Sequence, residues 1–348
     1  MSAQARGAAE IREVDPFDTE GVDAWHAAYL AADVHGRTSP APYQLEEMRA
    51  ELQATEKGRR VRAFAVCSGG AVVSSGFLDL PLLDHRSSAR LRVHTRPESR
   101  GLGHGSALLT HLEAIAEAEG RTVLNLETAW SHDLPADGAG VPTVGWLARR
   151  GYRLGLVDVQ RELALPVSTG RLERLADEAA AHHRDYTLRS WAGTMPDELV
   201  EGYLALSGSL PVEAPVGDLH VEHETLDVEH FRDVERRVAE QGRVVFHTVA
   251  LDGSGEVAAF TDLVVSTHDD NRAYQSGTLV RRRDRGHRLG LAVKVATLAL
   301  LQRERPEVVR VTTFNADVNA AMSGVNERLG FRAVEWLGEF QKRREPSP

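Results

Sequence analysis

The first half of the chain switches between two kinds of hydrophobic pattern. Apolar residues recur at helical spacing over 21–36 and 43–55, while β-rich runs over 61–70 and 71–81 are joined by a Ser-Gly-Gly hairpin signal. Further strands and two helices, each helix followed by a glycine that ends it, complete this half. The remaining strands are predicted over 9–15, 87–95, 122–130 and 153–165, and the remaining helices over 104–119 and 144–152.

The second half repeats this order of elements with little residue identity. A strand, two helices, a hairpin with its turn at Asp252 to Gly255, another strand, a loop-helix unit, a strand, a helix ended by Gly330 and a last strand follow in turn. This indicates an internal repeat of about 180 residues. Residues 166–185 are dense in Ala, Glu and Arg, which predicts a helical linker. The expected domains are residues 1–166 and 186–348, with the linker over 167–185.

The composition is that of a globular protein with two cores. The 348 residues exceed one ordinary domain, and 42% of them are hydrophobic and 26% charged. A net charge of −10 argues against nucleic acid as a partner, because bulk attraction to phosphates needs a basic face. The single cysteine, Cys67, fits a reducing cytoplasm. We read neither a signal peptide nor a membrane span, so we expect a cytoplasmic protein without a membrane partner.

Three glycines, Gly101, Gly103 and Gly105, stand at alternate positions directly before and within the start of the third predicted helix. Glycine allows positive φ and lets the backbone approach a ligand closely. The first N–H groups of a helix lack intrahelical acceptors, and the helix dipole adds partial positive charge. The stretch therefore predicts a seat for a phosphate or pyrophosphate. A tight connection whose glycines only make the turn is the alternative.

Two familiar phosphate-binding motifs do not fit this loop. A P-loop has a lysine after its last glycine, but Ser106 follows Gly105 here. The dinucleotide fingerprint spaces its glycines as Gly-x-Gly-x-x-Gly and opens a βαβ unit, whereas this loop follows a predicted antiparallel meander.

Residues 100–105, Arg-Gly-Leu-Gly-His-Gly, resemble the Arg/Gln-x-x-Gly-x-Gly/Ala loop of the GNAT acyltransferases. The element order over most of residues 8–165 is similar to that fold, residues 285–292 resemble the same loop, and residues 312–331 are similar to the end of a GNAT domain. The chain thus resembles a tandem GNAT protein, in the arrangement of mycothiol synthase and related two-domain acetyltransferases. The resemblance implies an α/β (α+β) fold of two tandem GNAT-like domains, each with a mixed, mostly antiparallel central sheet flanked by helices.

The second loop departs from the family pattern in either of two registers. Counted from Arg285, the loop has Arg288 where the first glycine should stand. Counted from His287, the glycine and the small residue fit, but the leading Arg/Gln becomes His. We prefer the first register, because Val280 then stands five residues before Arg285, as Thr95 does before Arg100.

The resemblance implies acetyl-CoA as co-substrate, with its pyrophosphate on the loop N–H groups, and no metal. Arg96, Arg100, Arg285 and Arg288 would neutralise phosphates. The cofactor-binding residues that the resemblance implies are Thr95, Arg100, Gly101, Leu102, Gly103, His104, Gly105, Val280, Arg285, Gly286, His287, Arg288, Leu289, Gly290, Asn315 and Asn319. Which copy holds acyl-CoA stays open, since the first has the better loop and the second the better final helix.

The family often places a tyrosine in the last helix, where it protonates the leaving thiolate. By register, that position is Leu147 in the first copy and Asn326 in the second. Leucine cannot donate a proton, which favours a structural or substrate-shaping role for the first domain.

Acyl transfer to an amine also needs a group that takes the amine proton. Glu127 lies on the strand that the family places beside the thioester, and Glu222 and Glu224 precede the second hairpin. Tyr274 and Asn326 complete the catalytic candidates. For each of them, a solvated or salt-bridged side chain is the alternative. The run HVEHE, residues 220–224, could in principle hold a metal, but no Cys or HExxH pattern supports one and we expect none.

We therefore expect transfer of acetyl from acetyl-CoA to an amine by direct reaction in a ternary complex. A small-molecule acceptor is preferred to a peptide or protein N-terminus, and a homodimer is open. The alternative is a non-catalytic acyl-CoA-binding sensor or interaction module with one or both sites decayed, which the missing tyrosines favour. The sequence does not identify the acceptor.

Overall fold

The computed structural model describes residues 9–55, 57–209, 215–220, 227–269 and 271–344. The described residues form two compact units. Of the described residues, unit 1 includes 9–157, 217–220 and 336–344, while unit 2 starts at Asp158 and ends at Glu335. The sequence placed the first domain boundary at residue 166 and gave the whole C-terminus to the second domain; in the structure the last strand is divided between the units.

Unit 1 is built on a mixed sheet whose strands follow the order β1-β2-β3-β4-β5-β12. Neighbours from β1 to β4 are antiparallel, and β4 and β5 are parallel. Its elements are β1 (Glu10–Glu13), α1 (Thr19–Asp33), α2 (Leu45–Gln53), β2 (Arg59–Ser68), β3 (Ala71–Pro81), β4 (Ser88–Thr95), η1 (Pro97–Ser99), α3 (His104–Ala118), β5 (Val123–Ser131), α4 (Pro142–Ala148), the start of β6 (Arg153–Ala164) and the end of β12 (Arg332–Arg343).

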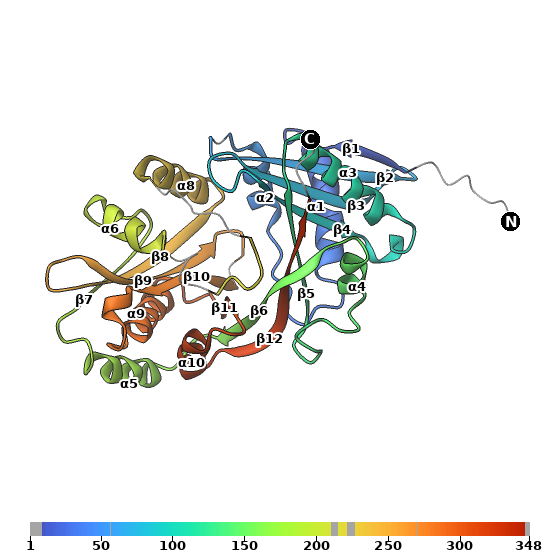
Figure 1. The fold of residues 1–348 in the computed structure, drawn as a ribbon. Helices are drawn as coiled ribbons and strands as arrows, with labels where there is room; N and C mark the ends of the chain where they lie inside the picture. Colours follow the sequence, from blue (N-terminus) through green and yellow to red (C-terminus); the bar gives the residue numbers. More distant parts are fainter. Residues whose placement is uncertain (1–8, 56, 210–214, 221–226, 270, 345–348) are drawn as a thin grey trace. The chain divides into compact units, whose positions relative to one another are not determined.

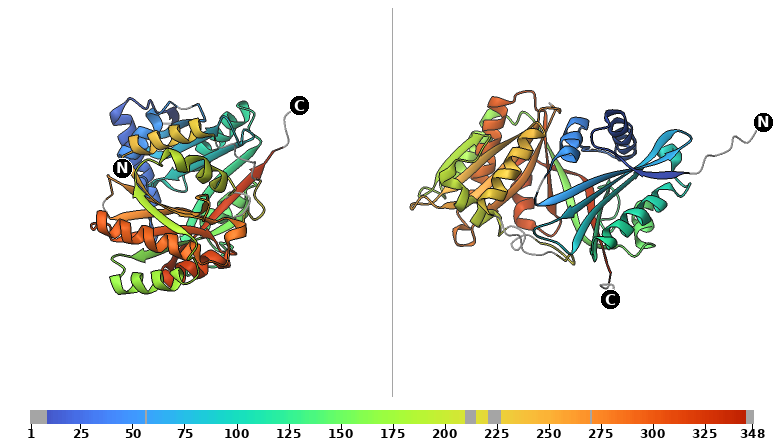
Figure 2. Two further views of the ribbon diagram at one scale, coloured as in Figure 1. Left: turned by 90° about the vertical axis from the view of Figure 1, so that its left-hand side faces the viewer. Right: turned by 90° about the horizontal axis from the view of Figure 1, so that it is seen from above.

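Helices cover both faces of the unit 1 sheet, as the views in Figures 1 and 2 show. Helices α1 and α2 pack on one face, where Trp25, Met48 and Phe77 belong to one buried cluster. Helix α3 packs on β3 and β4 and buries Leu108 and Leu112, which lie one turn apart. The apolar stripe in the sequence therefore fixes which side of α3 faces the sheet.

Unit 2 repeats this plan with the strand order β6-β11-β10-β9-β8-β7. The pairs are antiparallel except for β10 and β11, which are parallel. Its elements are the end of β6, α5 (Thr169–Ala180), β7 (Thr187–Ala192), α6 (Asp197–Ser207), α8 (Val228–Glu240), β8 (Arg243–Leu251), β9 (Val257–Ser266), β10 (Arg272–Val280), η2 (Arg282–Asp284), α9 (Leu289–Glu304), β11 (Arg310–Ala316), α10 (Ala320–Leu329) and the start of β12.

The segment expected as a linker forms helix α5, which is a packed part of unit 2. Leu172 and Ala179 of this helix are buried in one cluster with Leu298 of α9. Helices α6 and α8 lie on the other face of the sheet (Figure 1). The predicted fold of mixed, mostly antiparallel sheets flanked by helices is confirmed in both units. Within the described residues, no helix combines the length and the apolar character that crossing a membrane requires.

Candidate functional site

Strands β4 and β5 of unit 1 part from each other midway along their length. They pair in parallel over Ser88–Arg90 and Val123–Asn125, although β4 continues to Thr95 and β5 to Ser131. Backbone groups beyond the last pair are therefore released from the β4–β5 ladder. A strand edge of this kind can donate N–H groups to a ligand that enters between the strands.

The glycine loop follows β4 and opens α3. Gly101 has a φ of +77° and Gly103, the N-cap residue of α3, a φ of +88°, both in the left-handed region that favours glycine. A Cβ atom added to either residue would meet nothing within 4 Å, so this side of the loop is open. Leu102 is exposed between them, and His104 begins the helix. An open loop at a helix N-terminus is suited to hold an anion.

Gly105 has a different role, because the first turn of α3 packs closely on β4. A Cβ atom at Gly105 would lie 2.9 Å from Oγ1 of Thr95, closer than real Cβ contacts allow. The same hydroxyl lies 2.9 Å from Oγ of Ser74 and is held in place by that hydrogen bond. The third glycine and Thr95 thus set the distance between helix and strand.

Two arginines of the first loop contact only carbonyl oxygens among the described residues. Nε of Arg96 donates to the carbonyl of Val72 at 2.9 Å. Arg100 donates to the carbonyls of Thr95 at 3.2 Å and Ala32 at 3.3 Å. Neither guanidinium forms an ion pair with a carboxylate of the described chain. Their positive charges remain available to a phosphate.

The second loop follows the same backbone path. Arg285 donates from Nε to the carbonyl of Val280 at 3.4 Å, as Arg100 does to Thr95. Gly286 has a φ of +91°, and Arg288, with a φ of +54°, is the N-cap residue of α9. Arg288 therefore stands where unit 1 has Gly103. This correspondence is the register that aligns Arg285 with Arg100.

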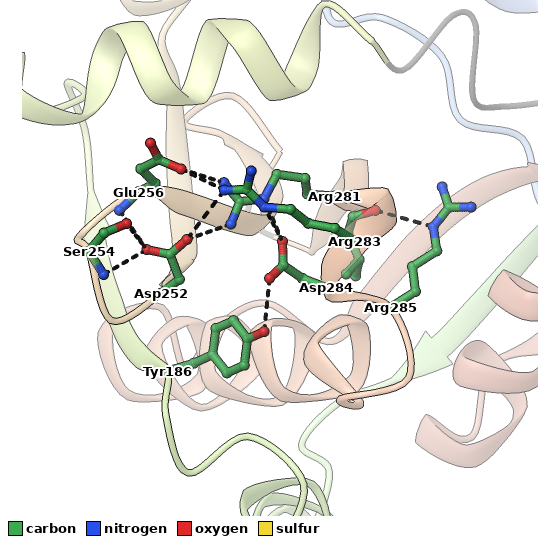
Figure 3. A network of polar contacts seen from close by, with 9 residues as sticks. Tyr186, Asp252, Ser254, Glu256, Arg281, Arg283, Asp284 and Arg285 are labelled. Carbon is green, nitrogen blue, oxygen red and sulfur yellow. Dashed lines mark hydrogen bonds and ion pairs between the residues drawn. The ribbon is translucent and has the colours of Figure 1, made fainter.

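Figure 3 shows the charged side chains around the second loop, which are paired with carboxylates. Arg281 pairs with Asp252 at 2.5 Å and also with Asp284, and Arg283 pairs with Glu256 at 2.7 Å. The hydrogen bonds from Ser254 and Arg281 hold the pKa of Asp252 well below its usual range.

The N-cap arginine of α9 is also neutralised. Arg288 forms an ion pair with Glu178 of α5, and the same carboxylate pairs with Arg328 of α10. Nδ1 of His287 lies 3.1 Å from the carbonyl oxygen of His182, which is two residues beyond the end of α5. Leu289 is buried, and Gly290 has room for a Cβ atom, 3.6 Å from Cγ2 of Val280. Carboxylates of unit 2 thus neutralise Arg281, Arg283 and Arg288, so less of this loop's charge is left for a phosphate.

A recess of unit 1 lies beside the parted strands. It is small and partly open to solvent. Arg92 of β4 lies over the rings of Tyr43 at 4.9 Å and Phe77 at 5.4 Å. The lining residues are Trp25, Tyr29, Tyr43, Met48, Ser75, Gly76, Phe77, Arg92 and His94. The recess thus combines an aromatic wall with one guanidinium group.

His94 is held neutral at ordinary pH. Its pKa is lowered to about 3, chiefly by burial and further by the charges of Arg92, Arg37 and Arg100. Its ring meets the edge of Tyr29 at 4.9 Å, and Nε2 lies 4.0 Å from Oδ1 of Asp33. A neutral imidazole can donate one hydrogen bond and accept another.

The predicted base, Glu127, is exposed on β5, two residues beyond the last one that pairs with β4. Its charge acts on Arg92, whose pKa is raised by Tyr43 and Glu127 against the effect of burial. An acidic and a basic side chain therefore flank the parted strands. Leu147, at the position where the family often has tyrosine, is buried in α4.

The residues predicted in the last helix of unit 2 belong to an internal polar network. Nζ of Lys294 donates to Oδ1 of Asn326 at 2.8 Å, and Nδ2 of Asn326 donates to Asn315 at 3.1 Å. Arg161 donates to the same oxygen of Asn315 at 2.8 Å. Asn319 caps α10 by accepting from the N–H of Met322. These contacts occupy the side chains, whose roles toward a cofactor or in catalysis stay predictions.

The other predicted catalytic residues of unit 2 are less informative. Tyr274 lies in the paired part of β10, opposite Thr312 of β11, and the guanidinium of Arg272 lies 6.0 Å from its ring centre. Glu222 and Glu224 lie outside the described residues. Within the part of the chain that is described, no group of three or more His, Cys, Asp or Glu residues is arranged to hold a metal ion.

Sequence reasoning missed Arg92 and His94. The run Arg90-Leu91-Arg92-Val93-His94 alternates polar and apolar residues, which in a strand puts the polar ones on one face. This alternation was visible in the sequence and predicts that Arg92 and His94 share a face of the strand. The aromatic residues around them come from α1, from the segment between α1 and α2, and from β3, and no local sequence pattern predicts that these elements meet.

Comparisons with known proteins agree with this architecture. A model described as Acetyltransferase (GNAT) family matches residues 28–138. The chain is similar to a solved tandem GNAT protein from the clavulanic acid biosynthesis pathway, with 27% identity, a TM-score of 0.80, and coverage of 98% of this chain and 100% of that chain.

Other solved structures share the fold at lower identity. A GCN5-related N-acetyltransferase from Sphaerobacter thermophilus has 14% identity and a TM-score of 0.66, covering 98% of this chain and 97% of that chain. A putative acetyltransferase from Pyrococcus horikoshii has 10% identity and a TM-score of 0.56, covering 98% and 91%. No sequence among the curated proteins matches. The GNAT family model thus matches the first half of the chain, and over its whole length the chain is similar to a solved tandem GNAT protein.

Proposed function

We propose that unit 1 transfers an acetyl group from acetyl-CoA to the amine of a small molecule. The observation that carries this proposal is the open glycine loop at the N-terminus of α3, directly beside the parted strands β4 and β5. The N–H groups of the open loop can bind the oxygens of a pyrophosphate. Arg96 and Arg100 can neutralise its charge, because neither pairs with a carboxylate of the described chain. When bound, acetyl-CoA supplies the thioester that the amine attacks.

The residues of unit 1 have separate tasks in this reaction. The loop and its two arginines hold the phosphates, which fixes the direction in which the acyl group points. N–H groups of β4 beyond Arg90 donate to the carbonyl oxygen and stabilise the negative charge that develops there. Glu127 takes the proton that the amine loses, directly or through water.

Protonation of the leaving sulfur does not require a tyrosine in this proposal. Leu147 is buried and has no proton to donate. A thiol has an ordinary pKa near ~8.5, so its thiolate readily takes a proton from water at neutral pH. The absence of the family's usual acid is therefore compatible with turnover, at a rate below that of an enzyme with a positioned acid.

The alternative is a protein that binds acyl-CoA without turning it over. Leu147 and the carboxylate-paired second loop favour it. Calorimetry with acetyl-CoA, followed by a free-thiol release assay over a panel of small amines, separates the two. Binding with turnover supports the enzyme, and binding without turnover across the panel supports the sensor.

Variants connect the result to unit 1. Gly103→Glu places a negative charge and a strained backbone at the N-cap, so acetyl-CoA binding should be lost. Glu127→Gln keeps the side-chain volume and should lower kcat about 10²-fold while leaving acetyl-CoA affinity unchanged. If Gly103→Glu binds acetyl-CoA like the wild type, the phosphate seat in unit 1 is refuted.

A further inference from the structure

The recess of unit 1 contains a guanidinium group whose hydrogen-bonding capacity is largely unused. Arg92 lies between the rings of Tyr43 and Phe77, and its one hydrogen bond to the described chain is a long one of 3.5 Å to the hydroxyl of Tyr43. It forms no ion pair with a described carboxylate. A guanidinium carries five N–H donors in a planar fork. Most of this fork is therefore available to a ligand.

The surroundings of the recess are positive although the chain as a whole carries a net charge of −10. Arg92, Arg37 and Arg100 all act electrostatically on His94, which lines the recess. The carboxylate of Asp33, 4.0 Å from that histidine, is engaged by Arg37 at 3.1 Å. A local excess of guanidinium groups in an acidic protein indicates an anionic ligand.

A second polar group in the lining has no partner in the described chain. Oγ of Ser75 is buried, with 1% of the residue exposed, and forms no hydrogen bond with a described residue. Unpaired buried hydroxyl groups are costly, so native proteins usually satisfy them. A ligand oxygen in the recess would satisfy this one.

We propose that the recess binds a carboxylate carried by a substrate, with Arg92 as the residue that selects for it. This inference rests on the proposed acyl transfer, and it names the chemical class of the substrate. Two parallel N–H groups of a guanidinium match the two oxygens of a carboxylate, and stacking on aromatic rings fixes their plane. Trp25, Phe77 and Met48 provide an apolar wall for the rest of the bound group.

The carboxylate has two chemical sources. It belongs either to the acceptor, which is then an amino acid, or to the acyl chain, which is then derived from a dicarboxylic acid. Glu127 is exposed on β5 and its charge acts on Arg92, so it can attract an ammonium group, which favours an amino acid as the acceptor.

Matched substrate pairs test the inference and distinguish these sources. L-phenylalanine and phenethylamine differ by the carboxylate of the acceptor, and succinyl-CoA and acetyl-CoA differ by that of the acyl chain. We expect the wild type to prefer the carboxylated member of one pair by at least about 10-fold in kcat/KM. Arg92→Met should remove that preference, and Arg92→Lys should be intermediate because it keeps the charge without the fork.

Arg90→Met is the matched control, because Arg90 is exposed on the same strand and does not line the recess. It removes the same charge and should keep the wild-type preference. Thermal melts of the variants confirm that each is folded. A wild type without preference in both pairs, or an Arg92→Met variant that keeps the preference, overturns the inference.

A titration that needs no turnover separates this inference from the proposed function. We expect 3-phenylpropionate to quench the fluorescence of Trp25, with an affinity that falls at least about 10-fold in Arg92→Met. Binding that depends on Arg92 in a protein without transfer activity supports the recess and refutes the enzyme. Transfer activity with no dependence on Arg92 in any of these measurements supports the enzyme and refutes the recess.

Discussion

Arg288 of the second loop forms an ion pair with Glu178, a carboxylate contributed by helix α5. The corresponding residue of the first loop is Gly103, which has no side chain to neutralise. The two loops thus share a backbone path and differ in charge. Helix α5, which the sequence presented as a linker, therefore affects the chemistry of the site in unit 2.

This contrast predicts one strong acetyl-CoA site per chain. Calorimetry of the wild type should give a stoichiometry of about one, because the first loop has the less compensated arginines. Glu178→Gln should release Arg288 and add a second, weaker site that is detectable at low salt. Glu173→Gln, on the same helix, is the control and should leave the stoichiometry unchanged. Two equal sites in the wild type would contradict the contrast.

The last glycine of each loop, Gly105 in the first and Gly290 in the second, should respond differently to alanine. Gly105→Ala places a Cβ atom 2.9 Å from Oγ1 of Thr95 and should lower the free energy of unfolding by about 1–3 kcal/mol. Gly290→Ala meets Val280 at 3.6 Å, an ordinary contact, and should be neutral or stabilising by up to about 1 kcal/mol. Chemical denaturation of the two variants measures the difference. Equal effects would show that the two helix starts pack alike.

Lys294 should give the protein a pH-dependent stability. Burial lowers the pKa of its amine to about 7, from 10.5 in an unfolded chain. Between these two values the unfolded state binds the proton and the folded state does not, so folding stability rises with pH. The largest slope is about 1.4 kcal/mol per pH unit.

Lys294→Met removes this contribution. The stability of the wild type relative to the variant should therefore increase from pH 7 to pH 10, measured as the difference in free energy of unfolding at each pH. Lys57→Met, at an exposed lysine, serves as the control. A flat difference for Lys294→Met would mean that the amine stays charged in the folded protein.

Glu113 of helix α3 binds side chains at the end of β12 and directly after it, within unit 1. Its carboxylate accepts hydrogen bonds from Tyr152 at 2.8 Å, Lys342 at 2.9 Å and Arg344 at 2.6 Å. Glu113→Gln should cost about 2–4 kcal/mol, because it removes the charge that compensates two partly buried cations.

The matched control is Glu117→Gln, which removes the other partner of Arg344. That carboxylate is 53% exposed, so its loss should cost no more than about 1 kcal/mol. Thermal and urea unfolding compare the two variants. Similar losses would show that the last strand is held mainly by backbone pairing.

Local patterns in the sequence determined the order and type of the elements. Hydrophobic period separates strands from helices over short windows, and glycines at Gly101 and Gly103 indicate positive φ because other residues rarely adopt it. The five-residue spacing between Val280 and Arg285 was likewise a local signal, and it selected the loop register. The two residues lie in one short segment, where Arg285 donates to the carbonyl of Val280.

Only the tertiary structure decided which charges meet. Glu178 and Arg288 are separated by more than a hundred residues, and Arg92 of β4 meets Tyr43, which lies between α1 and α2. Likewise, no sequence pattern indicated that residues 336–344 would join unit 1. Such contacts depend on the final positions of whole helices and strands. Those positions result from the joint burial of many side chains, which leaves no local pattern in the sequence.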